Sequence, residues 1–202
     1  MASEDPQTET VQHGVDVGDH MAFVDWLEAN PEDGRIEFRA RGVAEDAVNR
    51  TSAAIDEWSL GGEEMGGDRD HTLEFGLPAD LEESLGFADP EERYEAIEGA
   101  LAGLTACING TIAFNAVREG LAVEEIETRV RVPTDLRVLF GIHDVDRADE
   151  MFDEPMIDVT VTGTDLDGED VERIREYPKR SPVYNLVTLA HANEPSVTVE
   201  QA

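Results

Sequence analysis

Cys107 is the single cysteine of the chain and lies in a run of small and apolar residues, Ala100-Leu-Ala-Gly-Leu-Thr-Ala-Cys-Ile-Asn-Gly110. With no second cysteine, the chain cannot form an internal disulfide. A thiol acts as a nucleophile when a nearby positive group favours the thiolate. A buried free cysteine among small residues is otherwise an inert packing group. Both interpretations of Cys107 are open from the residues alone.

The histidines give no sign of a metal centre. The chain has five of them, and none forms a close ligand pair: His13, His20, His71, His143 and His191. The run His143-Asp-Val-Asp146 could coordinate a metal, but two aspartates in one loop are expected by chance in a chain this acidic. The chain has no nucleophilic serine elbow and no zinc-protease helix. The glycine-rich run at 61–67 lacks the lysine of a phosphate-binding loop. We therefore expect no metal and no cofactor.

The chain is strongly acidic along its whole length. It has 47 acidic and 15 basic residues, a net charge of −32, and a single lysine, Lys179. Such a surface is typical of proteins from salt-loving cells, where a Debye length of roughly 3 Å at 1 M salt screens the repulsion. A nucleic-acid mimic or a partner of basic proteins is the less favoured alternative. Direct nucleic-acid binding is not expected, because no basic patch is visible.

The length and hydrophobic content predict one domain. The 202 residues are 40% hydrophobic, enough for one core. We expect residues 1–12 to be a disordered segment and residues 13–202 to form the domain. Met1–Thr10 is polar and acidic, unlike a signal peptide, and we expect no segment apolar enough to span a membrane. A free thiol is normal in the cytoplasm, which is where we expect the protein.

The N-terminal half is predicted to contain one helix and several strands. The helix at 19–30 has apolar residues at helical spacing (Phe23, Trp26 and Leu27). Strict alternation predicts a strand at 35–41, and weaker patterns predict strands at about 49–60 and 73–77. The glycine-rich run at 61–67 predicts a mobile connection between them.

The longest predicted helix carries Cys107. We expect it to open at Pro90 with Asp89 as its cap and to end at Gly120. It has an apolar ridge made of Ile97, Leu101, Leu104, Ile108 and Ile112. Beside the ridge runs a stripe of small residues, which are Ala100, Gly103, Cys107 and Gly110. Another backbone can approach closely at such a stripe. One small domain has few elements to cover both faces, so we also expect a homodimer.

The C-terminal half predicts more strands and two shorter helices. Alternating residues predict strands at 126–132 and 157–161, separated by a long loop. Helices are expected at 167–177 and from a Ser181 cap to about Leu189, followed by an edge strand with Val197 and Val199. Strands and helices in this order indicate an α+β domain, not alternating βα units.

Several separated stretches together resemble one known family. They are His13-Gly-Val-Asp-Val17, Asn30-Pro-Glu32, Glu37-Phe-Arg-Ala40, Asn49-Arg50, Ala100-Leu-Ala-Gly103 with Cys107, and Arg180-Ser-Pro-Val-Tyr184. In this order they resemble the superfamily of osmotically inducible protein C (OsmC) and organic hydroperoxide resistance (Ohr) proteins. The resemblance is closest to the OsmC-like branch with an extra N-terminal helix.

The resemblance implies an OsmC-like fold, in which antiparallel sheets wrap around central helices in an intertwined homodimer. It also implies a thiol-dependent peroxidase that reduces organic or inorganic hydroperoxides. Cys107 would be the peroxidatic cysteine and Arg50 the arginine that stabilises its thiolate. Ser181 stands where the peroxidases have their resolving cysteine, so turnover would need an external thiol.

The family also has a catalytic glutamate, for which Glu98 is the best-spaced candidate and Glu95 the next. The Asn-Pro that usually precedes it is missing here. Nine residues place Glu98 roughly 180° around a straight helix from Cys107 and ~13 Å away. A shared site therefore needs a bend in the helix, for example at Gly99 or Gly103. The alternative function is a non-catalytic protein of this fold that binds a small apolar ligand in the cleft of the dimer interface.

Overall fold

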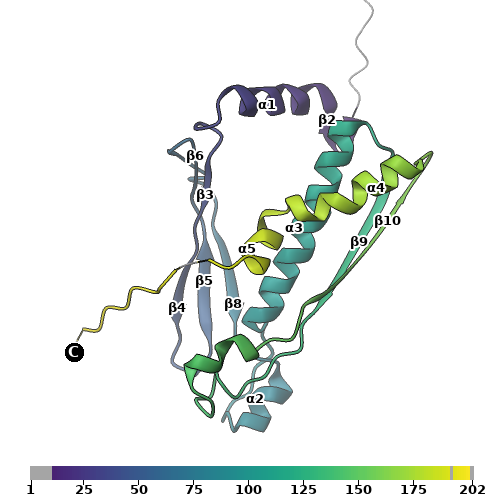
Figure 1. The fold of residues 1–202 in the computed structure, drawn as a ribbon. Helices are drawn as coiled ribbons and strands as arrows, with labels where there is room; N and C mark the ends of the chain where they lie inside the picture. The colour runs from purple at the N-terminus through teal and green to yellow at the C-terminus, as the bar shows by residue number, and fades with distance from the viewer. Residues whose placement is uncertain (1–10, 192, 201–202) are drawn as a thin grey trace, which may run out of the picture. The chain divides into compact units, whose positions relative to one another are not determined.

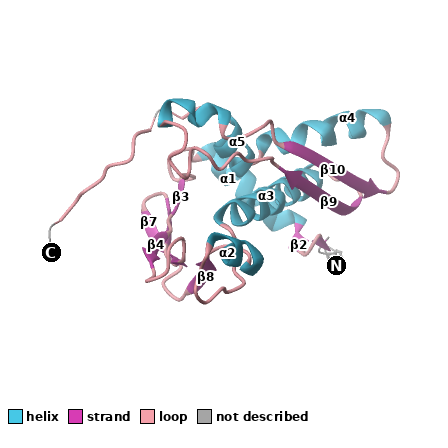
Figure 2. Cartoon of the chain, turned by 90° about the horizontal axis from the view of Figure 1, so that it is seen from below, coloured by secondary structure: helices cyan, strands magenta, loops and turns pink. Residues whose placement is uncertain are grey.

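The computed structural model describes residues 11–191 and 193–200 (Figures 1 and 2). Helices are combined with antiparallel strand pairs, so the predicted α+β class is confirmed. The chain divides into two compact units, which are described separately. Unit 1 contains the chain up to Ala102 together with residues 117–120, and unit 2 contains residues 103–116 and those from Leu121 onward. Of the segment expected to be disordered, residues 1–10 lie outside the described residues.

Unit 1 begins with a short hairpin and a helix. Strand β1 (Val11–Gln12) pairs with β2 (Val15–Asp16), and helix α1 (Val17–Ala29) follows directly. The Asp16 carboxylate caps this helix by accepting a hydrogen bond of 2.8 Å from the Asp19 N–H. The helix predicted at 19–30 is therefore confirmed.

Unit 1 also contains two three-stranded antiparallel sheets, with strand orders β3-β6-β7 and β4-β5-β8. The strands are β3 (Ile36–Phe38), β4 (Arg41–Ala44), β5 (Thr51–Ile55), β6 (Trp58–Leu60), β7 (Glu63–Met65) and β8 (His71–Phe75). The strands predicted at 35–41 and 49–60 are each divided in two. The glycine-rich run is not a loose connection: Gly61 and Gly62 adopt positive φ, and their turn pairs β7 with β6.

The segment before the long helix differs from the prediction. A helix that the sequence did not suggest, α2 (Ala79–Leu85), precedes it, and helix α3 (Ala96–Glu119) begins six residues later than expected. Residues 90–95 are extended instead, because their backbone bonds to the chain after β8. The Gly76 N–H donates to the Tyr94 carbonyl at 2.9 Å, and the Arg93 N–H donates to the Leu77 carbonyl at 3.2 Å.

Two glutamates close the first turn of α3. The Glu98 carboxylate accepts a hydrogen bond of 3.1 Å from the Glu95 N–H, and the Glu95 carboxylate accepts one from the Ile97 N–H. This reciprocal arrangement is that of a capping box. The helix ends as predicted at Gly120, whose φ of 67° is the left-handed conformation that terminates helices.

Unit 2 is built around the middle of α3. Its other elements are β9 (Val123–Arg131), η1 (Val145–Glu150), β10 (Met156–Gly163), α4 (Gly168–Glu176), η2 (Tyr177–Arg180) and α5 (Pro182–Thr188). Strands β9 and β10 form a two-stranded antiparallel sheet. The core is Leu104, Ile108, Ile112, Ala116, Leu121, Val123, Ile174 and Tyr177. The predicted strands and helices of this region, up to Leu189, are confirmed.

The predicted edge strand at the C-terminus is wrong. Val197 and Val199 are 79% and 85% exposed, and residues 193–200 form no strand. Alternation alone does not make a strand, since the backbone of these residues has no neighbouring strand to pair with in the described part of the chain.

Helix α3 also corrects the expectation about membrane segments. By length and composition, its 24 residues could cross a membrane. In this structure, however, Leu104, Ile108, Ile112 and Ala116 of α3 form the core of unit 2, with residues of β9 and β10 packed against them. The apolar character of α3 is that of a core helix.

Candidate functional site

Arg50 stands at the start of β5, at the centre of a polar cluster in unit 1. The preceding residue, Asn49, has a φ of 64°, a left-handed conformation that asparagine tolerates better than most residues. The Asn49 side-chain amide donates to the Gly76 carbonyl at 3.3 Å. The turn before β5 is closed by a hydrogen bond of 2.9 Å from the Glu45 N–H to the Arg50 carbonyl. These contacts fix the backbone from which the Arg50 side chain extends.

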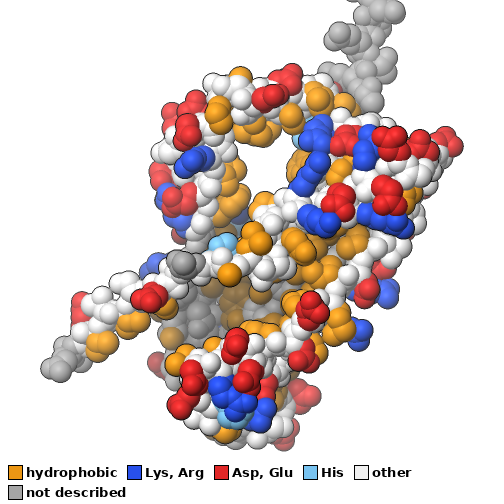
Figure 3. All heavy atoms as spheres, viewed as in Figure 1, with side chains coloured by type: hydrophobic (Ala, Val, Ile, Leu, Met, Phe, Trp, Pro, Cys, Tyr) orange, Lys and Arg blue, Asp and Glu red, His pale blue; other side chains and the backbone are white. Residues whose placement is uncertain are grey.

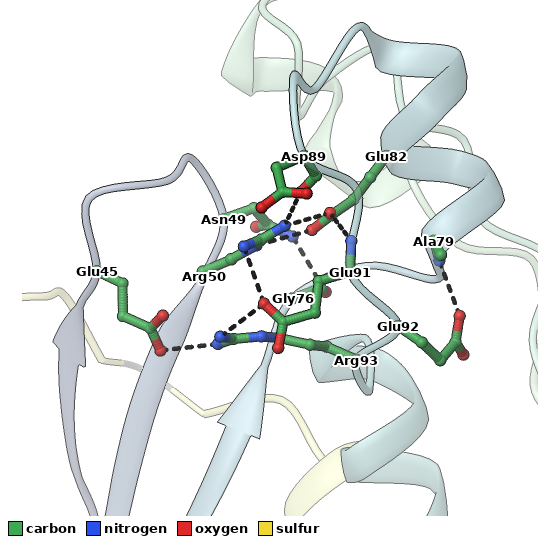
Figure 4. Close-up of polar contacts among 10 residues, drawn as sticks. All are labelled: Glu45, Asn49, Arg50, Gly76, Ala79, Glu82, Asp89, Glu91, Glu92 and Arg93. Atoms are coloured by element: carbon green, nitrogen blue, oxygen red, sulfur yellow. Dashed lines mark hydrogen bonds and ion pairs between the residues drawn. The ribbon is translucent and has the colours of Figure 1, made fainter.

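Glu82 of α2 holds the Arg50 guanidinium with both carboxylate oxygens (Figure 4). Arg50 Nε donates to Oε1 at 3.1 Å and Nη2 donates to Oε2 at 2.6 Å. Oε2 also accepts the Glu91 N–H at 2.8 Å. The Glu82 side chain is fully buried, and that of Arg50 is 12% exposed. Bidentate, charge-assisted pairs of this kind have a defined geometry, so the position of the guanidinium is well fixed.

Glu91 links this pair to a second arginine. Its Oε2 accepts hydrogen bonds from Arg50 Nη1 at 3.0 Å and from Arg93 Nη2 at 3.2 Å. Arg93 Nη1 donates to Glu45 at 2.7 Å. Gly76 makes room for Arg93, because an added Cβ there would lie 2.9 Å from Arg93 Cδ. The five charged side chains form one network, which we call the Arg50 cluster: Glu45, Arg50, Glu82, Glu91 and Arg93.

The hydrogen bonds of the cluster favour the charged forms of four of its side chains, which are Glu45, Arg50, Glu82 and Arg93. The Arg50 guanidinium lowers the pKa of Glu82, and Arg93 lowers the pKa of Glu45. In return, Glu82 raises the pKa of Arg50. Two guanidiniums therefore face three carboxylates, and the positive charge of Arg50 is already balanced. An anion that approaches Arg50 has to displace one of these carboxylates. Glu91, whose side chain is 50% exposed, is easier to displace than the buried Glu82.

Cys107 lies in unit 2, on α3, and its side chain is partly buried. It is next to Ile108 of the buried ridge but belongs to the stripe of small residues beside it. A Cβ added at Gly103 or Gly110 of this stripe would meet no atom within 4 Å among the described residues. The Cys107 carbonyl accepts a hydrogen bond of 2.7 Å from the Thr111 hydroxyl. The side of the helix that carries Cys107 is therefore uncrowded at Gly103 and Gly110.

Ser181 has the structural role that the sequence predicts for it. It is fully buried, and its hydroxyl caps α5 by accepting the Tyr184 N–H at 3.2 Å. The neighbouring Arg180 donates to the Asn115 side chain, and its guanidinium lies 5.4 Å from the centre of the Tyr177 ring.

The predicted site residues thus have different surroundings. Arg50 is joined to Glu82 and Glu91, whereas Glu98 caps the first turn of α3. The sequence reasoning missed Glu82 and Glu91. Neither carries a local signal, since other acidic residues stand beside both in the sequence.

Over residues 11–191 and 193–200, no group of three or more His, Cys, Asp or Glu side chains is arranged to hold a metal ion.

Comparisons with known proteins support the fold. No protein-family model matches the chain, and no curated protein matches its sequence. Its structure is similar to the crystal structure of an OsmC-like protein from Mycoplasma pneumoniae, with a TM-score of 0.52 and 14% identity over 75% of this chain and 86% of that one. The crystal structure of the organic hydroperoxide resistance protein OhrB of Bacillus subtilis matches with a TM-score of 0.40 and 16% identity, over 75% of this chain and 89% of that one.

The chain is therefore an α+β protein with an OsmC-like fold. The first of these similarities carries that conclusion, and it confirms at the level of the fold the resemblance to the OsmC/Ohr superfamily.

Proposed function

We propose that this protein is a thiol-dependent peroxidase that reduces organic or inorganic hydroperoxides. The observation that carries the proposal is the fixed guanidinium of Arg50, which the buried Glu82 holds with both oxygens. The resemblance assigns to Arg50 the stabilisation of a thiolate, and an arginine for this task must be charged and oriented in advance. The OsmC-like fold and the single thiol on its long helix are consistent with this assignment.

The proposed reaction begins with the Cys107 thiolate. Its sulfur attacks the terminal oxygen of the hydroperoxide, the O–O bond breaks, and the alkoxide that leaves takes up a proton to become an alcohol. Cys107 is oxidised to a sulfenic acid. One external thiol then condenses with the sulfenic acid, which releases water and leaves a mixed disulfide. A second external thiol attacks that disulfide and restores Cys107.

The carboxylates have separate proposed roles. Glu82 is a positioning residue, because it orients Arg50. Glu91 is the carboxylate that an anion displaces when it binds to Arg50, since Glu91 is more exposed than Glu82. The catalytic role of Glu98 stays a prediction, beside the capping bond that this side chain makes.

An external reductant is part of the proposal. Ser181 has no thiol and is buried at the start of α5, so a resolving disulfide does not form there. We further propose that the protein works as an intertwined homodimer in the cytoplasm of a salt-loving cell. The acidity of the chain and the open stripe of small residues on α3 support this part.

A second function is favoured by one observation. The three carboxylates of the Arg50 cluster outnumber its two arginines, so Arg50 has no excess positive charge to offer a thiolate. This suits a non-catalytic protein of the same fold that binds a small apolar ligand in the cleft of the dimer interface.

Peroxide consumption separates the two functions. Purified protein in molar KCl is mixed with cumene hydroperoxide or hydrogen peroxide and with dithiothreitol, and the remaining peroxide is measured over time. We expect turnover by the natural chain and none by Cys107→Ser. Thr105→Ser, a mild change on the same helix, is the matched control. Turnover that survives in Cys107→Ser would remove the mechanism, and no turnover by the natural chain with any thiol would favour the binding protein.

A further inference from the structure

An apolar groove lies between β10 and α4 in unit 2. Its volume is about 550 Å³, within the range of roughly 300–1,000 Å³ that is typical of small-molecule sites. Alternate residues of β10, among them Val159 and Val161, form one wall. Val171 and Ile174 of α4 form the other. The groove contains neither Cys107 nor any residue of the Arg50 cluster, so an inference about it is independent of the proposed peroxidase.

The two ends of the groove differ in chemistry. Helix α4 runs back along β10 after the turn that joins them, as Figures 1 and 2 show. The end near this turn is lined by Val161, Leu166 and Val171. The far end, where α4 gives way to η2, is lined by Arg175 and Lys179. The groove therefore has an apolar end and an end with two cations.

These cations are concentrated in a chain that has few. Residues 168–180 hold four of the 15 basic residues, including the single lysine, together with four acidic residues, and Figure 3 shows Lys and Arg side chains interleaved with Asp and Glu along α4. Arg175 pairs with Glu172, and Lys179 pairs with Glu176. All four side chains are more than 60% exposed. Exposed pairs of this kind contribute little to stability, so another carboxylate can take the place of the glutamates.

We propose that this groove binds the anion of a medium-chain fatty acid. The alkyl chain lies along β10 with its end toward Leu166, and the carboxylate accepts hydrogen bonds from Arg175 and Lys179. Both parts of the ligand follow from the groove: the aliphatic walls favour a hydrocarbon chain, and the cationic end favours an anion over an alcohol or an ammonium group.

Calorimetric titration of the full chain in buffered molar KCl tests the proposal, with potassium decanoate as the probe below its micelle concentration. We expect one saturable site per chain. Affinity should fall from decanoate to octanoate by up to about fourfold for each methylene removed. Decan-1-ol and decyltrimethylammonium should bind at least about tenfold more weakly than decanoate, because they cannot accept the charged hydrogen bonds.

Two variants locate the site. Arg175→Gln combined with Lys179→Gln should weaken decanoate binding by about tenfold or more. Both side chains are exposed, so the variant should fold, which circular dichroism checks. Arg129→Gln is the matched control, because Arg129 is an exposed arginine of unit 2, paired with Glu127 and outside the groove. Its affinity for decanoate should not change.

A decanoate analogue with a photoreactive diazirine at the end of its chain gives a second measurement. Mass spectrometry should find the crosslink in peptides that contain residues 157–174. No binding of decanoate, equal binding of decyltrimethylammonium, unchanged affinity in the double variant, or crosslinks confined to other segments would each overturn the proposal. Loss of peroxidase activity in Cys107→Ser leaves all these results unaffected, so the two proposals fail separately.

Discussion

Glu82 receives the Arg50 guanidinium on both of its oxygens, at 3.1 and 2.6 Å, from a position with no exposure to solvent. A buried charge is stable only when its partner and its remaining hydrogen bonds are in place. For Glu82 the third bond comes from the Glu91 N–H. The pair therefore has two consequences, one for stability and one for the thiol that Arg50 is proposed to serve.

Removal of the guanidinium charge should slow the reaction of the thiol. If Arg50 stabilises the Cys107 thiolate, Arg50→Met reduces the fraction of thiolate, and alkylation by iodoacetamide at neutral pH becomes slower in proportion. Arg129→Met, at an exposed arginine outside the cluster, is the control. Equal alkylation rates in the natural chain and in Arg50→Met would withdraw the role of Arg50.

Neutralising Glu82 should destabilise the fold. Glu82→Gln removes the buried charge that holds Arg50 and leaves Glu91 as its partly exposed charged partner, so we expect the melting temperature to fall by roughly 5–10 °C. Glu92→Gln is the comparison, because Glu92 accepts one backbone hydrogen bond, from Ala79, and makes no ion pair among the described residues. Scanning calorimetry at constant salt measures both. A fall no larger for Glu82→Gln than for Glu92→Gln would contradict the structural role of the pair.

Acid should weaken the Arg50 cluster. The pKa of Glu82 in the folded chain lies below its ordinary value of 4.5. The stability that this carboxylate contributes is therefore fully present above about pH 4.5 and is lost as the pH falls through the folded pKa. Urea unfolding between pH 7 and pH 3 should show a smaller loss of stability in Glu82→Gln than in the natural chain. Parallel curves for the two proteins would refute this.

Glu98 offers a test between capping and catalysis. Glu98→Ala removes the hydrogen bond to the Glu95 N–H, and we expect a loss of about 1 kcal/mol in the free energy of unfolding. If capping is its whole contribution, peroxide turnover at a temperature well below melting stays unchanged. Turnover that falls tenfold or more while the fold is intact would establish the catalytic role that the resemblance suggests.

The oligomeric state should depend on salt. We expect light scattering in molar KCl to give about twice the chain mass of 22.2 kDa, because the stripe of small residues on α3 is open to a second copy. At low salt the Debye length grows and the carboxylates repel one another, so association should weaken or the chain should unfold. A mass near that of one chain in molar salt would count against the dimer.

Much of the fold was predictable because it depends on local patterns. The buried ridge of Leu104, Ile108 and Ile112 follows helical spacing, and the Ser181 cap follows local side-chain chemistry. What could not be predicted depends on contacts between distant segments. The sequence at 90–95 resembles the first turn of a helix, yet this run is extended because its backbone is hydrogen-bonded to Gly76 and Leu77.

The same reason limits the prediction of the site. Asn49-Arg50 was recognisable as a motif, but the partner of Arg50 lies 32 residues away on a helix that the sequence did not suggest. Among 47 acidic residues, nothing in the neighbouring sequence distinguishes Glu82. It is distinguished by the burial of its carboxylate in the folded structure.

The bonds of Arg50 to Glu82, to Glu91 and to the Asp89 carbonyl at 2.7 Å make this side chain a clasp. It closes a loop of about 40 residues and ties the chain that leads into α3 to the start of β5. Because a guanidinium keeps its proton at any physiological pH, alkali does not open the clasp. Acid opens it by protonating Glu82 as the pH falls through the lowered pKa of that carboxylate, so the entry to α3 would loosen at low pH.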